Sequence, residues 1–235
     1  MLEIKNLTKI YKGGVKAVDN LSLSVKAGEI YGFIGHNGAG KSTTIKAIVG
    51  ALGFDGGEIL VDGLSIVDRP IEVKSRIAFV PDNPDIYEHL TGIQYLNFVC
   101  DIFRVGEERN DMIKEYAELF ELEKNLGDMI SSYSHGMKQK LVLISSLVHK
   151  PKLLILDEPF VGLDPIASHK LKELMKKMCA EGSAIFFSTH VLEVAEKLCD
   201  RVGIIKKGQL VKEGTMQEIA GDKSLESLFL EIANA

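Results

Sequence analysis

The sequence has little that would place it in a membrane, in a secretory route or on nucleic acid. No apolar run approaches the roughly 20 residues that a helix needs to cross a bilayer. Residues 1–5 lack the apolar core of a signal peptide, so we expect no leader. The 28 Lys and Arg residues are outnumbered by 33 Asp and Glu residues, which gives a formal charge of −5. We therefore expect no nucleic-acid partner, because such a partner requires a basic surface.

Cysteine is also scarce. The three cysteines, Cys100, Cys179 and Cys199, are widely spaced and odd in number. This pattern fits neither a disulfide framework nor a zinc site, and it suits a reducing compartment in which each cysteine is a small core residue. The chain lacks internal repeats and low-complexity tracts as well. Its 235 residues can bury one substantial core, or a core with one inserted subdomain.

A glycine-rich stretch follows an apolar strand pattern at residues 29–34 and precedes a helical pattern at residues 42–49. The stretch Gly35-His36-Asn37-Gly38-Ala39-Gly40-Lys41-Ser42-Thr43 matches the phosphate-binding loop G-x-x-x-x-G-K-[ST]. Glycines let such a loop turn its amides into one concavity at a helix N-terminus, which favours an anion. Lys41 can reach the β- and γ-phosphates of a nucleotide, and the Ser42 hydroxyl can bind Mg²⁺. The expected nucleotide-binding residues of this loop are Gly35, Asn37, Gly38, Ala39, Gly40, Lys41, Ser42 and Thr43.

Two acids follow a second apolar strand pattern, at residues 152–157. Ligands of open α/β sheets bind at the carboxyl ends of strands, so Asp157 is placed to hold Mg²⁺, directly or through water. Glu158 is placed to orient or deprotonate an attacking water. A nucleotide kinase needs no such base, and the chain has no Asn-Lys-x-Asp-like base reader of a GTPase. The sequence therefore predicts ATP hydrolysis.

The remaining patterns predict an α/β fold. Residues 91–148 read as mostly helical, and from Pro151 onward strand patterns alternate with helical ones, which indicates a mainly parallel sheet covered on both faces. Strands are expected at residues 21–25, 29–34, 58–61, 76–80, 152–157, 184–188, 202–205 and 209–211, and helices at residues 42–49, 166–180 and 191–199. The single expected domain, residues 1–235, divides into a catalytic core at about 1–84 and 151–220, a helical subdomain at about 85–150 and a C-terminal helix at 221–235.

A further stretch opens a helical pattern before the strand that ends in the two acids: Ser134-His135-Gly136-Met137-Lys138-Gln139-Lys140. Here the chain resembles the ATP-binding-cassette (ABC) ATPases, whose signature motif reads Leu-Ser-Gly-Gly-Gln at this distance. Ser134 and Gly136 are kept, whereas Tyr133, His135 and Met137 replace the other three residues. A hydroxyl and free amides at a helix start form an anion site. For His135 by itself, we expect a solvent-facing side chain.

Three more stretches resemble motifs of this family. Gly162-Leu163-Asp164 resembles its D-loop, which lines the dimer interface, and Asp164 is the residue of interest there. Ser188-Thr189-His190 resembles its switch histidine, which contacts the γ-phosphate. Tyr11 resembles the aromatic residue that stacks on adenine. The resemblance covers about residues 1–220 and implies a phosphate-loop NTPase core, RecA-like, with an antiparallel β region near the N-terminus and an inserted α-helical subdomain.

One departure concerns the family's Q-loop glutamine. Its position, after the strand pattern that ends in Val80-Pro81, holds Asp82, and Asn83 follows. An aspartate can accept a hydrogen bond from a metal-bound water, but it cannot donate one as an amide can. Either Asp82 takes the role on the metal side or Asn83 supplies the amide. The resemblance thus implies Ser42, Asp157 and Asp82 as metal-site residues.

The resemblance also implies an assembly and a partner. Two cassettes form a head-to-tail dimer around two ATP molecules, as a homodimer or as a heterodimer with a second ABC subunit. Each site takes the phosphate loop, Asp157 and the catalytic residues Lys41, Glu158 and His190 from one subunit and the signature residues from the other. An integral membrane permease subunit on a separate chain is the implied partner, at the cytoplasmic face of the cell membrane.

Several alternatives accompany this interpretation. The variants Asp82 and His135 and the short C-terminus look most like exporter-type cassettes. A soluble ABC ATPase acting on ribosomes or DNA usually has two cassettes, a coiled-coil arm or a basic surface, none of which the sequence shows. A regulatory subunit without hydrolysis is disfavoured by the intact catalytic residues. Finally, Ile86, Tyr87 and Leu90 either dock a cytoplasmic helix of the membrane subunit or only pin the helical insertion to the sheet.

Overall fold

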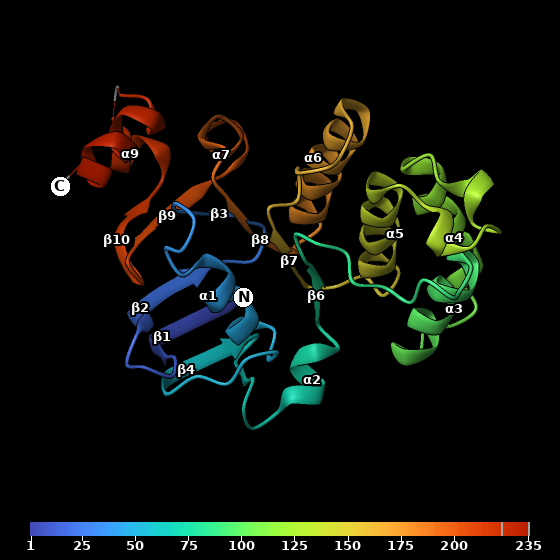
Figure 1. The fold of residues 1–235 in the computed structure, drawn as a ribbon, viewed down its shortest axis with the longest axis horizontal. Coiled ribbons are helices and arrows are strands. Elements are labelled where there is room, and N and C mark those ends of the chain that lie inside the picture. The colour runs from blue at the N-terminus through green and yellow to red at the C-terminus, as the bar shows by residue number, and fades with distance from the viewer. Residues whose placement is uncertain (222, 235) are drawn as a thin grey trace.

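The computed structural model describes residues 1–221 and 223–234, and Figure 1 shows them as two sheets with helices between and beside them. The expected C-terminal helix at residues 221–235 falls partly on residues 222 and 235, which lie outside the described part. The described chain ends in two helices, α8 (Met216–Ala220) and α9 (Leu225–Asn234). None of the helices formed by the described residues is long and apolar enough to cross a membrane.

The smaller sheet is antiparallel and has the strand order β2-β1-β4-β5. Its strands are β1 (Leu2–Ile10), β2 (Lys16–Val25), β4 (Gly56–Val61) and β5 (Leu64–Ser65). Strand β1 was not predicted. Its buried residues Leu2 and Ile4 alternate with exposed ones, but the next buried residue is Leu7, because the register against β2 shifts there and Asn6 has a φ of +52°. This irregularity breaks the period of two that marks a half-buried strand.

The larger sheet has the strand order β10-β9-β3-β8-β7-β6. Its strands are β3 (Ile30–Ile34), β6 (Ile77–Val80), β7 (Leu153–Asp157), β8 (Ala184–Thr189), β9 (Arg201–Lys206) and β10 (Gln209–Gly214). All pairs are parallel except that of β9 and β10. Every residue of β3, β7 and β8 is buried, as expected of parallel strands with both faces covered. The predicted fold class is confirmed.

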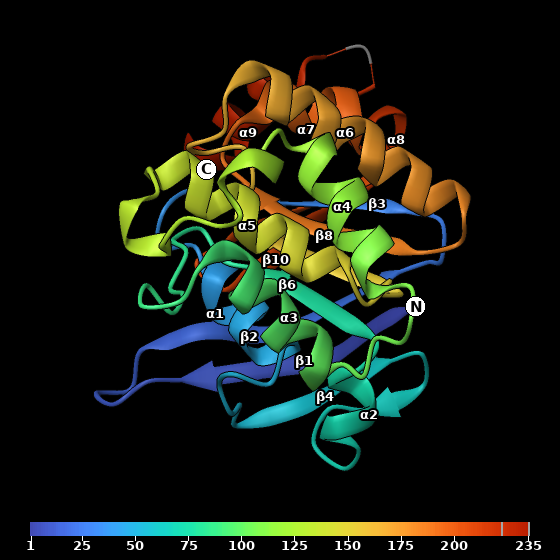
Figure 2. The same ribbon diagram turned by 90° about the vertical axis from the view of Figure 1, so that its right-hand side faces the viewer.

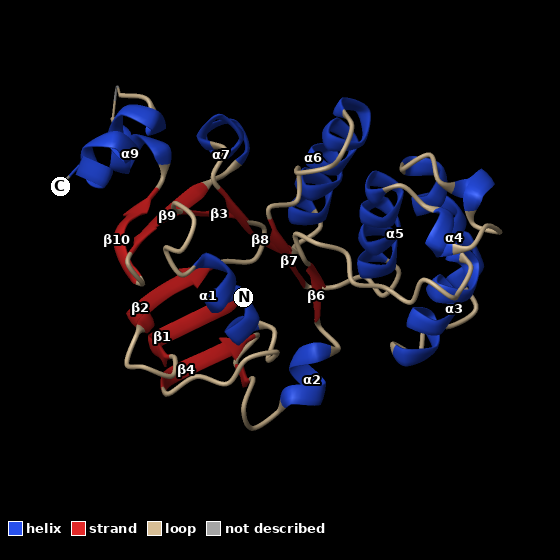
Figure 3. Ribbon diagram, in the orientation of Figure 1, coloured by secondary structure: helices blue, strands red, loops and turns tan. Residues whose placement is uncertain are grey.

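Helices cover both faces of the larger sheet (Figures 1 and 3). On one face, α1 (Lys41–Ile48) packs between the two sheets. On the other face lie α6 (Pro165–Ala180) and α7 (Leu192–Leu198), whose contacts are with β3 and β8. A short helix that was not predicted, α2 (Pro70–Lys74), precedes β6.

The insertion between β6 and β7 is helical and forms the near side of the molecule in Figure 2. It contains α3 (Gly92–Ile102), α4 (Arg109–Leu119) and α5 (His135–Leu147), together with the 3₁₀ turns Glu123–Asn125 and Ile130–Ser132. Thr91 starts α3 with a capping box, in which its side chain accepts from the Gln94 amide while the Gln94 side chain accepts from the Thr91 amide. The apolar faces of these helices join the core beneath α6, so the insertion and the sheet share one cluster of buried residues.

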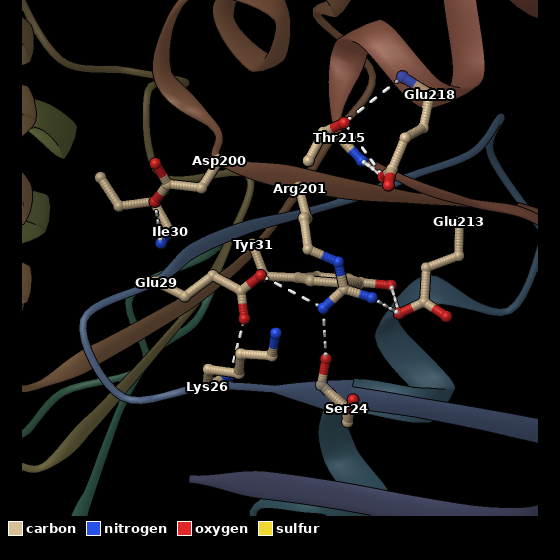
Figure 4. A network of polar contacts seen from close by, with 10 residues as sticks. All are labelled: Ser24, Lys26, Glu29, Ile30, Tyr31, Asp200, Arg201, Glu213, Thr215 and Glu218. Carbon is tan, nitrogen blue, oxygen red and sulfur yellow. Dashed lines mark hydrogen bonds and ion pairs between the residues drawn. The ribbon is translucent and has the colours of Figure 1, made fainter.

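Polar contacts around Arg201 join the two sheets (Figure 4). The guanidinium of this β9 residue donates to the Ser24 carbonyl at 3.1 Å and to the Glu29 carboxylate at 3.2 Å. It also donates to Glu213 of β10 at 2.7 Å, and the same Glu213 oxygen accepts from the buried Tyr31 hydroxyl at 3.0 Å. Burial is the main cause that raises the pKa of Tyr31 well above its ordinary value. The three cysteines are free, and burial raises the pKa of the Cys179 thiol to about 12.

Candidate nucleotide-binding and catalytic site

The glycine-rich loop connects β3 to α1, at the carboxyl edge of the larger sheet. Gly40 has a φ of +112°, and a Cβ atom at this position would lie 2.5 Å from the carbonyl oxygen of Ala17. Only glycine fits there, because both the backbone conformation and the space exclude a side chain. The loop is anchored on its other side, where the Gly208 amide donates to the Ala39 carbonyl at 2.8 Å.

A cavity of about 230 Å³ lies over this loop, and nine of the predicted site residues line it. Its lining consists of Ala17, His36, Asn37, Gly38, Gly40, Lys41, Ser42, Thr43, Asp82, Asp157 and Glu158. The loop, Asp82 and the two acids thus lie at the ends of three strands, β3, β6 and β7, at one edge of the sheet. Ala17 and His36 were not predicted as lining residues, and no motif singles them out.

Lys41 lies on the floor of the cavity and is only 6% exposed. Its ammonium donates to the carbonyl of Gly35 at 2.6 Å and to that of His36 at 3.4 Å. Oε1 of Glu158 lies 3.6 Å from the same nitrogen. A buried ammonium placed here attracts an anion into the cavity, since a charge counts for more at low dielectric than in water.

Asp157 ends β7 and Glu158 follows it; both line the cavity, and a serine of β8 contacts them. The Ser188 hydroxyl donates to Oδ1 of Asp157 at 2.5 Å and accepts from the Glu158 amide at 3.1 Å. This contact follows from the register in which Asp157 pairs with Ser188. Asp157 is buried, so its carboxylate is held by the hydroxyl rather than by bulk water. The sequence predicted no separate role for Ser188, which appeared there only as the first residue of the motif that contains His190.

His190 meets Glu158 from the end of β8. The Glu158 atom Oε2 lies 2.9 Å from the His190 ring atom Nδ1 and 3.3 Å from the His190 amide, which donates to it. Glu158 adopts a φ of +50°, a left-handed conformation that directs its side chain out of the strand. The carboxylate is therefore fixed by His190 through one oxygen, while the other faces Lys41.

Two predicted residues lie at the margins of the cavity. The Tyr11 hydroxyl is 3.4 Å from the Thr43 hydroxyl, and the ring is 42% exposed beside the loop. It does not line the cavity itself. Of the Q-loop pair, Asp82 lines the cavity, whereas Asn83 does not; the backbone N–H of Asn83 donates to the Asp82 carboxylate at 2.9 Å.

The signature residues start α5, away from this cavity. Ser134 caps the helix, and its hydroxyl accepts from the Met137 amide at 3.2 Å. His135 is exposed, as expected, and Gly136 is half-buried. Asp164 caps α6 in the same manner by accepting from the Ala167 amide at 2.8 Å. Neither the signature residues nor Asp164 are among the described residues that line the cavity of their own chain.

Comparison with known sequences places the chain in a family. The profile of the family described as ABC transporter matches residues 18–161. The uncharacterized ABC transporter ATP-binding protein YhcH of Bacillus subtilis is 39% identical over 213 residues, covering 90% of this chain and 68% of that protein. The bacitracin transport ATP-binding protein BcrA of Bacillus licheniformis is 37% identical, and the match covers 91% of this chain and 69% of that protein. The ABC-type transporter ATP-binding protein EcsA of B. subtilis is 34% identical, and the match covers 99% of this chain and 96% of that protein.

Solved structures agree with the sequences. An ATP-binding subunit of an ABC transporter gives a TM-score of 0.95 at 35% identity and covers 99% of both chains. The cassette MJ0796, in a dimeric post-hydrolysis state bound to ADP and Pi, gives 0.83 at 27% identity and covers 92% of this chain and 99% of that one. The chain thus belongs to the ABC transporter family, as a subunit that binds and hydrolyses ATP.

Proposed function

We propose that two copies of this chain close head to tail around two ATP molecules, so that the signature residues of each copy complete the site of the other. The composition of the cavity carries this proposal. It gathers the phosphate loop with Asp157 and Glu158, whereas Ser134 caps a helix elsewhere on the same chain. The similar cassette MJ0796 is dimeric in two solved structures. A heterodimer with a second ABC subunit would build its sites in the same way.

In each site, the residues of one chain bind the nucleotide and prepare the water. The amides of the loop and Lys41 bind the phosphates, and Tyr11 stacks on the adenine at the rim. Glu158 acts as general base: it accepts a proton from the water that attacks the γ-phosphorus, while the bond to ADP breaks and ADP and phosphate result. His190 holds the Glu158 carboxylate by 2.9 Å and 3.3 Å contacts to one oxygen, while the other oxygen lies 3.6 Å from the Lys41 ammonium in the cavity.

The oxygen donors of the cavity fit Mg²⁺. The Ser42 hydroxyl and the carboxylates of Asp82 and Asp157 line one space, and hard oxygen ligands of this kind are those that Mg²⁺ prefers. When bound, the ion neutralises charge on the phosphates. We assign the Q-loop role to Asp82 rather than Asn83, because Asp82 lines the cavity and its carboxylate is oriented by the backbone N–H of Asn83.

A second cavity, of about 470 Å³, supports a membrane partner. It lies where the helical insertion meets the core, which we delimit at about residues 85–150 against 1–84 and 151–220. Its lining is Val49, Ala51, Lys74, Ile77, Ala78, Phe79, Pro81, Asp85, Ile86, Tyr95, Val99, Phe103, Val142, Ser145, Ser146 and His149. We assign it to a cytoplasmic helix of an integral membrane permease on a separate chain, which places this chain at the cytoplasmic face of the cell membrane. Ile86 and Leu90 pack on the core, whereas Tyr87 is 52% exposed beside the opening.

The proposed direction of transport is export. Two relatives support it by their names, the bacitracin transport protein BcrA and the linearmycin resistance ATP-binding protein LnrL of Bacillus subtilis, which is 37% identical to this chain. Resistance to a compound is what an outward pump for that compound would confer. The variants Asp82 and His135 point the same way.

The substitution Glu158→Gln tests the catalytic assignment. It keeps the shape of the side chain and removes the base, so ATP binding should persist while turnover falls by at least about 100-fold. A dimer should then accumulate with ATP and Mg²⁺, visible by size-exclusion chromatography. Glu173→Gln, an exposed acid on α6, is the matched control and should turn over normally. Turnover of Glu158→Gln within a few-fold of wild type would refute the role.

A further inference from the structure

His135 is exposed, yet its ring lies close against Gly162 of the D-loop. A Cβ atom added to Gly162 would come within 2.8 Å of Cδ2 and 3.0 Å of Nε2 of His135. The same test at Gly136 meets the carbonyl oxygen of Gly162 at 3.0 Å. The start of the signature helix α5 therefore touches Gly162 of its own chain closely enough that neither glycine could carry a side chain without movement.

A second contact ties the same two elements together. The Lys140 ammonium, one turn further along α5, lies 2.8 Å from Oδ2 of Asp164, and the Lys140 side chain is only 15% exposed. The other oxygen of Asp164 caps α6. The contact with Lys140 is the main reason why the pKa of Asp164 is lowered from its ordinary value. Both ends of the D-loop are thus held by α5.

The D-loop in turn leads directly back to the catalytic acid. A tight turn separates them, in which the Val161 amide donates to the Glu158 carbonyl at 3.1 Å. Phe160, inside this turn, packs edge-on against Phe187 of β8 with ring centroids 6.0 Å apart. The hydrogen bond and the aromatic contact restrict the backbone between Glu158 and Gly162. A displacement of Gly162 is therefore transmitted to Glu158 rather than taken up by rotation within the turn.

We propose that His135 is a positioning residue that couples the two ATP sites of the dimer. The proposal rests on the proposed function, because it requires the signature of one subunit to close on the nucleotide of the other. When Ser134 engages the partner's nucleotide, the adjacent His135 presses on Gly162 and thereby sets Glu158 for the nucleotide bound by its own chain. Occupancy of either site then favours hydrolysis in the other, and the coupling is mutual because the two subunits are alike.

The test is the dependence of steady-state ATP hydrolysis on ATP concentration, measured with the purified full chain. For wild type we expect a Hill coefficient well above 1, with about 2 as its ceiling for two sites. His135→Ala should lower it toward about 1 and reduce the maximal rate by about 5-fold or more. ATP binding by the single chain and the melting temperature should stay as in wild type. His135→Phe keeps a planar ring over Gly162 and should retain the cooperativity.

A glycine pair provides the matched control. Gly162→Ala adds a methyl group against His135 at a φ of +82° and should also lower the Hill coefficient. Gly182→Ala imposes similar backbone strain, at a φ of +94°, but nothing lies within 4 Å of the added methyl group. It should lower the melting temperature without changing the cooperativity.

Unchanged cooperativity and rate in His135→Ala overturn the coupling role, and so does a wild-type Hill coefficient of 1, which would also count against closure around two ATP molecules. Unchanged cooperativity in His135→Ala leaves the proposed function intact as long as Glu158→Gln still abolishes turnover. Normal hydrolysis by Glu158→Gln would instead remove the proposed function itself. The two failures are therefore distinguishable in one set of variants.

Discussion

At the scale of single residues, the site is organised around one carboxylate. Glu158 is fixed by His190 on one oxygen and lies 3.6 Å from Lys41 on the other, while its amide donates to Ser188. Lys41, Glu158 and His190 could be found in sequence because each belongs to a motif of fixed spacing. The role of Ser188 could not, because it depends on the register that places Ser188 opposite Asp157 in the neighbouring strand. Register between distant strands leaves no local pattern in the sequence.

His149 gives a residue-scale prediction on stability. Its ring stacks on Phe103 with centroids 3.8 Å apart, and Nε2 donates to the Ile77 carbonyl at 3.1 Å. Burial lowers the pKa of His149, and this hydrogen bond offsets only part of that effect. The folded chain therefore keeps the ring neutral where the unfolded chain, with a pKa of about 6.5, already takes up a proton. The contribution of this pKa difference to the free energy of unfolding is fully present above about pH 6.5, and it is lost as the pH falls from there toward the pKa of the folded chain.

We expect His149→Gln to keep a donor for the Ile77 carbonyl but to lose the titration. Its free energy of unfolding should fall less than that of wild type between about pH 7 and pH 5, as measured by denaturant titration. His169→Gln removes an exposed histidine of α6 and should follow the wild-type slope. Equal slopes for wild type and His149→Gln would contradict the prediction.

At the scale of elements, the parallel strands were the easiest to predict. Strands β3, β7 and β8 are buried on both faces and so appear as unbroken apolar runs. Strand β1 was missed because its bulge interrupts the alternation, and α2 because five residues are too few to show a helical period. The sequence left two interpretations of residues 86–90 open, docking of the membrane subunit or packing of the insertion on the sheet. In the structure, Ile86 and Leu90 pack on the core, while Tyr87 is exposed and contacts Phe98 edge-on.

This division sharpens the docking prediction for the loop before α3. Tyr87→Ala should spare folding and basal ATP hydrolysis, because the side chain is 52% exposed, but it should weaken copurification with the membrane subunit and uncouple transport. Leu230→Ala, at a similarly exposed apolar position on α9, is the control and should copurify normally. A buried aromatic would instead cost about 3–5 kcal/mol on truncation. Early melting of Tyr87→Ala with normal partner binding would count against docking.

At the scale of the whole molecule, the proposed assembly requires one chain to hold two half-sites that face different nucleotides. The phosphate loop and the acids lie at the edge of the larger sheet, and the signature lies at the start of α5 in the helical insertion (Figure 1). Motif spacing predicted both halves from the sequence. It could not show that they stand apart in one chain, because that separation depends on how the insertion packs on the core.

The separation predicts complementation between two inactive variants. Ser134→Arg should leave ATP binding by the single chain intact but block closure, because a bulky side chain then stands where the partner's nucleotide must approach. Lys41→Ala should lose phosphate binding in its own site. In a mixed dimer, the intact loop of the Ser134→Arg chain meets the intact signature of the Lys41→Ala chain, so one site of two is restored. In an equal mixture half of the dimers are mixed, and hydrolysis should recover to at most about a quarter of wild type if active sites count equally.

Ser75→Arg, the same substitution at an exposed position after α2, is the control for charge and bulk and should hydrolyse normally. Normal hydrolysis by Ser134→Arg alone would show that the signature acts in no composite site, whereas recovery only on mixing is what closure between two chains requires.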